Sequence, residues 1–104
     1  MTRYYLTRDA SEDLDEIRRY LDRVPEQHAA PIRRSLRSLL QEVASHPNRG
    51  RNYSAATRIL GEEVRTCAAP PYRIFYRDNR GTPEVLAILH MARDIEAILT
   101  ERLQ

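Results

Sequence analysis

The stretch Tyr72–Arg77, YRIFYR, combines residue types that recognise anions and bases. A guanidinium group can donate two parallel hydrogen bonds to a phosphate or a carboxylate, and a tyrosine ring can stack on a nucleobase. The β-branched and aromatic composition predicts a strand. Alternation along that strand predicts Arg73, Phe75 and Arg77 on one face and Tyr72, Ile74 and Tyr76 on the other. The sequence leaves open whether the arginines are paired within the sheet or contact a partner.

His90 is the residue best suited to general acid–base chemistry, because an imidazole titrates close to neutral pH. It lies in an apolar run, Val85–Met91, that is typical of a central strand covered on both faces. A histidine in that position is expected to be a structural residue with satisfied hydrogen bonds. Arg93 and Asp94 follow, but an arginine cannot act as a base. An aspartate that opens a helix is expected to be its N-cap.

The remaining candidate residues favour structural roles. Tyr72 and Tyr76 could serve as stacking platforms for bases, but tyrosines of a half-buried sheet are expected in the core. Cys67 is the only cysteine, which excludes an internal disulfide and fits a reducing compartment. It has no recognisable catalytic companions and is expected to be a small buried hydrophobic residue. The three histidines and Cys67 do not have the spacing of metal ligands, so neither a metal nor another cofactor is expected.

The charge distribution argues against general nucleic-acid binding. All 17 basic residues are arginine, yet the net charge is only +2. A GC-rich coding bias would also explain the absence of lysine. Positions 49–80 carry seven arginines against three acidic residues, whereas the predicted first helix is acidic. One basic side of the molecule would favour an acidic partner. No apolar run is long enough to span a membrane and the N-terminal residues turn acidic early, so a cytoplasmic protein is expected.

The sequence before the YRIFYR segment predicts one strand followed by two helices. Arg3–Leu6 predicts a short strand, and Thr7 is a good N-cap for the helix that follows and ends near Pro25. The second helix is expected to start near His28, with Pro31 in its first turn. Apolar residues recur every three or four positions in both helices. They are Ala10, Leu14, Ile17, Leu21 and Val24 in the first helix, and Ala29, Ile32, Leu36, Leu39, Leu40 and Val43 in the second.

The second half of the chain is expected to form the sheet. Asn48–Ala56 has no period and predicts a loop, and Thr57–Leu60 predicts an extended or turning connection to a strand at Glu63–Cys67. That strand should pair antiparallel with Tyr72–Arg77. Two amphipathic helices of this kind form a hairpin that must bury its apolar stripes on the sheet. We therefore expect one α+β domain over residues 1–104, with an α-helical hairpin packed on a small antiparallel β-sheet in the order β-α-α-β-β-β-α.

Five short motifs occur in this order: L-T-x-x-A-x-x-D-L at 6–14, H-P-x-x-G-R at 46–51, V-R at 64–65, P-Y-R-I-F-Y-R at 71–77 and H-x-x-R-D at 90–94. Together they resemble the ParE toxins of the RelE/ParE superfamily of bacterial toxin–antitoxin modules. The resemblance covers nearly the whole chain and implies the same element order. It also implies growth arrest, by binding and poisoning DNA gyrase. The alternative that it implies is a ribosome-dependent mRNA endonuclease of the RelE kind.

The resemblance also implies partners and site residues. The expected partner is a cognate, ParD-like antitoxin with a ribbon–helix–helix DNA-binding domain and a disordered C-terminal segment, in a higher-order complex. For partner binding, it implies Arg65, Arg73, Tyr76, Arg77 and Arg93. For a nuclease, it implies catalysis by Arg65, Arg73, His90 and Arg93. Nuclease relatives commonly carry a His–Tyr or Tyr pair after the last strand. Arg93 and Asp94 stand there in this chain, which argues against RNase activity.

Overall fold

A five-stranded sheet forms the middle layer of the protein, whose computed structural model describes residues 3–104. The strand order is β1-β5-β4-β3-β2, so the chain's first strand lies beside its last. Strands β3, β4 and β5 pair antiparallel as predicted. Strand β2, which was not predicted, pairs antiparallel with β3, and β1 adds one parallel pair with β5 at the edge. The strands are β1 (Tyr5–Leu6), β2 (Arg51–Asn52), β3 (Arg65–Ala69), β4 (Tyr72–Asn79) and β5 (Thr82–His90). The predicted α+β class is confirmed.

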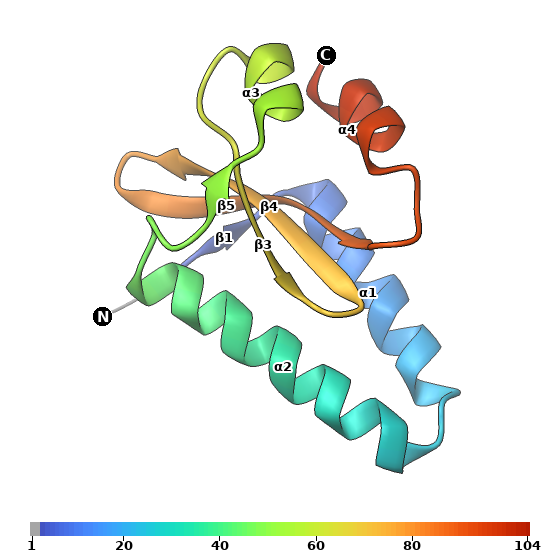
Figure 1. Cartoon of the computed structure of the whole chain (residues 1–104). Helices are drawn as coiled ribbons and strands as arrows, with labels where there is room; N and C mark the ends of the chain where they lie inside the picture. Colours follow the sequence, from blue (N-terminus) through green and yellow to red (C-terminus); the bar gives the residue numbers. More distant parts are fainter. Residues whose placement is uncertain (1–2) are drawn as a thin grey trace.

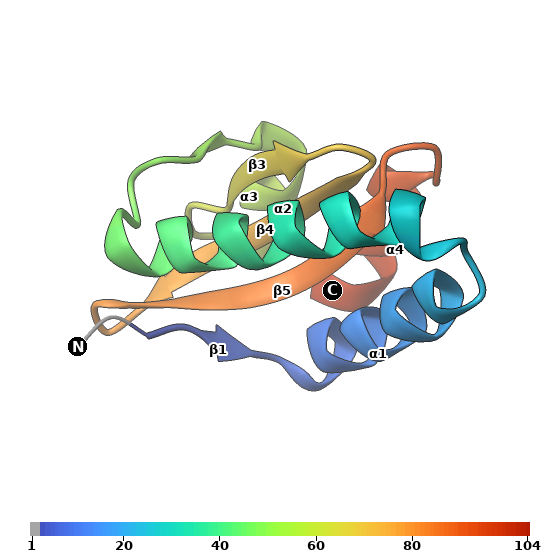
Figure 2. The ribbon, with the colours of Figure 1, turned by 90° about the horizontal axis from the view of Figure 1, so that it is seen from below.

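The helical hairpin, α1 (Arg8–Asp22) and α2 (Glu26–Ser45), covers one face of the sheet (Figures 1 and 2). The predicted N-cap is confirmed, because Thr7 Oγ1 accepts a hydrogen bond from the Ala10 amide at 3.1 Å. The predicted start of α2 near His28 is wrong: the helix begins at Glu26, which places Pro31 inside it. Proline in a helix removes one backbone hydrogen bond. Pro31 is exposed, and so is Gln27, whose carbonyl oxygen loses the donor.

Apolar side chains form a core on each face of the sheet, which confirms the predicted alternation in β4. Tyr72, Ile74 and Tyr76 pack against the α1–α2 hairpin. Phe75 points the other way, into a second core. Between Phe75 and Tyr76 the register with β5 shifts by one residue. Such a bulge increases the local twist of the strands. On both sides of it, the side chains of β4 keep alternating between the two faces of the sheet. The second core is completed by Ala56, Val64, Leu86, Ala87, Leu89 and Leu99.

Helices α3 (Ser54–Leu60) and α4 (Ile95–Leu103) cover the second face (Figure 2). The predicted loop and extended connection between positions 48 and 60 are therefore wrong, since they contain β2 and α3. A helix of seven residues is too short to display a period, and it forms here because Ala56 is fully buried under α4. Asp94 is the N-cap of α4, as predicted, with its Oδ1 accepting from the Ala97 amide at 3.2 Å.

Candidate partner-binding surfaces

The structure distributes the predicted site residues over three separate hollows. Arg65, Tyr76 and Arg77 line one of about 320 Å³ at the end of the sheet. Arg73 lines another, at the outer edge of β3. His90 and Arg93 line the third, between α1 and the end of β5. The residues implied for a nuclease, Arg65, Arg73, His90 and Arg93, are therefore not brought together in one hollow.

Arg65 holds a loop in place. Its Nε donates to Glu63 at 3.0 Å, and its Nη1 donates to the carbonyl oxygens of Gly50, at 2.5 Å, and Asn48, at 3.2 Å. The two carbonyl groups belong to the segment that connects α2 to β2. The internal contacts favour a structural role, which was one of the two alternatives left open by the sequence.

Tyr76 lies in the core and is only 2% exposed. Its hydroxyl donates to the carbonyl oxygen of Pro47 at 2.7 Å and accepts from the Gly50 amide at 2.9 Å. Burial is the main cause that raises the pKa of Tyr76 above its ordinary value. A phenol satisfied in this way fixes the loop after α2 and is not offered to a partner on the surface of the folded chain.

Arg77 is paired with two acidic side chains of the same chain. Its Nε donates to Glu84 at 2.8 Å, across the β4–β5 ladder, and its Nη1 contacts Glu62 in the loop after α3. Hydrogen bonds to Glu62 and Glu84 raise the pKa of Arg77. This guanidinium therefore fastens the α3–β3 loop to the sheet.

Arg73 has a different environment. Its Nη1 donates to Thr66 Oγ1 at 3.2 Å. Within residues 3–104 no carboxylate lies within ion-pair distance of it, and Glu63 pairs with Arg65. Arg49 and Arg51 line the same hollow. Of the four arginines implied for partner binding, Arg73 and the exposed Arg93 are those without an internal ion pair in the described part of the chain.

His90 occupies a structural position. Its Nδ1 accepts from the Ala92 amide at 3.0 Å, and its ring stands edge-on to Tyr72, with 5.4 Å between centroids. His90 is also the cross-strand partner of Tyr72, and directly paired residues point to the same face. It therefore lies on the hairpin face, whereas Arg73 points to the opposite one. Arg65 shares the face of His90 but pairs with Tyr76, about 13 Å further along β4.

Asp13 and Arg102 form a largely buried ion pair that was not predicted from the sequence. Asp13 is 6% exposed, and Arg102 of α4 donates to both of its oxygens, each at 2.7 Å. The Ile88 amide also donates to Asp13, at 3.0 Å. This amide lies on β5 beyond the pairing with β1, which ends at Val85. The pair therefore closes the open edge of β5 and ties α1 to α4. A visible signal was the carboxylate within the buried stripe of α1, which runs Ala10, Asp13, Ile17, Leu21.

Cys67 is half-buried, and burial raises the pKa of its thiol to about 11 despite the nearby guanidinium groups of Arg49 and Arg73. The thiol is therefore protonated at neutral pH, as fits a structural residue. In the part of the chain that the structure describes, no three His, Cys, Asp or Glu side chains are grouped as metal ligands would be.

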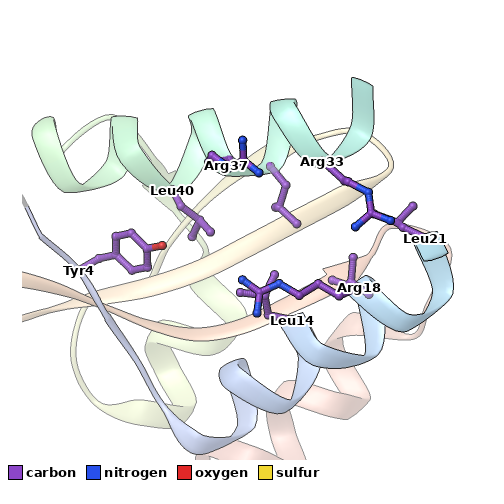
Figure 3. A pocket seen from close by; sticks show the side chains of 9 residues that line it. Tyr4, Leu14, Arg18, Leu21, Arg33, Arg37 and Leu40 are labelled. Atoms are coloured by element: carbon purple, nitrogen blue, oxygen red, sulfur yellow. The ribbon is translucent and has the colours of Figure 1, made fainter. Parts of the chain in front are cut away.

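An apolar groove runs between α1 and α2 (Figure 3). Leucines from both helices line it, and arginines flank them. Arg18 and Arg33 are paired with Asp15, at 3.7 Å, and Asp22, at 2.8 Å, whereas the described residues offer Arg37 no ion pair. The cavity of about 210 Å³ is lined by Tyr4, Leu14, Ile17, Arg18, Leu21, Arg33, Leu36, Arg37 and Leu40.

The fold and these surfaces define a small α+β protein with a helical hairpin on a sheet, in the order predicted for toxins of the RelE/ParE kind apart from the short elements β2 and α3. The chain matches the family described as ParE toxin of type II toxin-antitoxin system, parDE, over residues 4–95. It therefore belongs to the ParE toxin family and is a toxin of a type II toxin–antitoxin system, which has a cognate antitoxin. No curated protein matches it. Within residues 3–104 no helix is both long and apolar enough to cross a membrane.

Proposed function

We propose that this toxin stops bacterial growth by binding and poisoning DNA gyrase in the cytoplasm, not by cutting RNA. The observation that supports a binding mechanism is the separation of His90 from Arg73 on opposite faces of the sheet. A nuclease needs its acid–base group and its phosphate-binding cations around one reacting phosphate. Moreover, Nδ1 of His90 is already occupied by the Ala92 amide.

The partner in this proposal is a ParD-like antitoxin with a ribbon–helix–helix domain. Its disordered, acidic C-terminal segment would fold into the groove between α1 and α2, in a higher-order complex. The apolar floor suits the apolar side of an amphipathic helix, and the arginines suit its carboxylates. A small acidic protein encoded immediately beside this chain is expected to be that antitoxin.

Induced expression of the chain in bacteria tests the target. We expect growth arrest with DNA-damage signalling before any change in mRNA, because trapped gyrase leaves broken DNA. The stable variant His90→Gln should be as toxic as the parent, since the substitution removes the titrating group and keeps side-chain size. Codon-linked mRNA cuts as the first event, together with loss of arrest in His90→Gln, would establish the RNase alternative. Harmless expression, with no adjacent antitoxin gene, would contradict the proposal as a whole.

A charge reversal at Arg37 tests the groove. Arg37 is exposed and has no internal ion pair within residues 3–104, so Arg37→Glu should leave folding intact. Loss of a charge-assisted contact is worth about 1.5–3 kcal/mol, so antitoxin affinity should fall roughly 10- to 150-fold. Isothermal titration calorimetry measures this. Arg19→Glu, on the same hairpin but outside the groove, is the matched control. Equal effects of the two variants would show that only overall charge matters.

A further inference from the structure

The outer edge of β3 is only partly covered. Strand β2 consists of Arg51 and Asn52, which pair with Thr66 and Arg65, so none of the strands in residues 3–104 lies beside the edge from Cys67 to Ala69. The Tyr53 amide donates to the Val64 carbonyl, and backbone groups in an antiparallel ladder alternate between their two neighbours. Val64, Thr66 and Ala68 therefore direct their backbone N–H and C=O groups away from β4. Ala68, which is exposed, presents both groups at the open edge.

Arginines surround this open edge. Arg49, Arg51 and Arg73 line a hollow of about 420 Å³ with Thr66, Cys67 and Ala68. Arg49 forms an ion pair with Glu42 of α2, at 2.8 Å. Arg51 and Arg73 have no carboxylate partner within residues 3–104. Arginines at this edge disfavour pairing with a second copy of the chain, because each copy would bring the same charges.

The hollow continues along α2. A second cavity, of about 600 Å³, shares Arg49 and Ala68 with the first and follows the flank of α2 that faces β3, where Arg34 and Ser38 contribute side chains. Figure 1 shows α2 running beside this end of the sheet. This flank of α2 lies opposite the α1–α2 groove, which involves Arg33 and Arg37. The two cavities together form a continuous furrow beside the outer edge of β3.

We propose that this furrow binds an extended acidic peptide, which adds a strand to β3 at Ala68 and places carboxylates against Arg51 and Arg73. A free backbone edge specifies a peptide, because strand addition uses main-chain hydrogen bonds that a nucleic acid cannot supply. The guanidinium groups specify acidic side chains. The identity of the occupant rests on the proposed function: it is a second segment of the antitoxin, which passes from the α1–α2 groove around α2 to this edge.

Binding of a short acetylated peptide that alternates glutamate and valine, followed by fluorescence anisotropy, tests the surface itself. Arg51→Ala and Arg73→Ala should each weaken binding roughly 10- to 150-fold. Ala68→Pro should abolish it, because proline removes the outward amide and is tolerated on an edge strand. Arg58→Ala, an exposed arginine of α3, is the matched control and should change nothing. A peptide with lysine in place of glutamate should not bind.

Three outcomes would overturn the proposal. The first is peptide binding that Ala68→Pro leaves unchanged. The second is tighter binding of a single-stranded oligonucleotide, abolished by Arg73→Ala, which would assign the arginines to a nucleic acid. The third is concentration-dependent dimerisation that Ala68→Pro removes, which would assign the edge to a second copy of the chain.

Hydrogen–deuterium exchange in the complex with the protein encoded beside this chain identifies the occupant. We expect the amides of 66–69 to exchange at least tenfold more slowly than in the free toxin. A complex that forms but leaves these amides unprotected would refute the inference and leave the proposed function intact. Peptide binding without any complex would refute the antitoxin as occupant and leave the surface established.

Discussion

Replacing Asp13 with asparagine is expected to lower the free energy of unfolding by about 3–5 kcal/mol, because removal of one partner strands the other charge of a buried ion pair. Both guanidinium hydrogen bonds of Arg102, at 2.7 Å, end on this carboxylate. The Ile88 amide depends on it as well. The substitution therefore disturbs α1, α4 and the edge of β5 together.

Urea unfolding of the isolated toxin measures this effect. Arg102→Gln should be destabilising to a similar degree, since it leaves the carboxylate of Asp13 buried without a cation. Asp15→Asn is the matched control: Asp15 lies on the same helix and pairs with Arg18 at 3.7 Å, but both side chains are largely exposed. An exposed pair contributes about 0–1 kcal/mol. Losses below about 1 kcal/mol in all three variants would show that the buried pair contributes no more than an exposed one.

Replacing Gly50 with alanine is expected to cost about 2–4 kcal/mol, from overpacking and from the loss of a buried hydrogen bond. A Cβ atom at this position would lie 2.7 Å from the Tyr76 hydroxyl and 2.9 Å from the Thr66 carbonyl oxygen. Neither atom can move freely. The hydroxyl is held by Pro47 and by the Gly50 amide itself, and the carbonyl belongs to β3, where Thr66 is paired with strands on both sides.

Unfolding of the double variant Gly50→Ala, Tyr76→Phe distinguishes this contact from a general effect of alanine. Removal of the hydroxyl relieves the closest contact, so the double variant should lose less stability than the two single variants summed. Strict additivity would place the cause of the Gly50→Ala loss elsewhere.

Features that depend on near neighbours in the chain could be predicted from the amino-acid sequence. The apolar stripes predicted α1 and α2, because a helix brings residues three and four apart to one side. Thr7 and Asp94 predicted the starts of two helices, because the side chain of an N-cap accepts a hydrogen bond from an amide only three residues away. Alternation in YRIFYR predicted the two faces of β4, because successive side chains of a strand point in opposite directions. These local signals were sufficient for the fold class.

Features that depend on strand register and on contacts between distant segments could not be predicted in this way. The pairing of Tyr72 with His90 put His90 and Arg73 on opposite faces, which no local pattern could specify. Arg77 and Arg73 look alike in the sequence, yet the α3–β3 loop brings Glu62 to one of them only. Asp13 and Arg102 meet although 89 positions separate them. Helix α3 forms because α4 covers it. In each case the free energy comes from packing between segments, which local periodicity does not record.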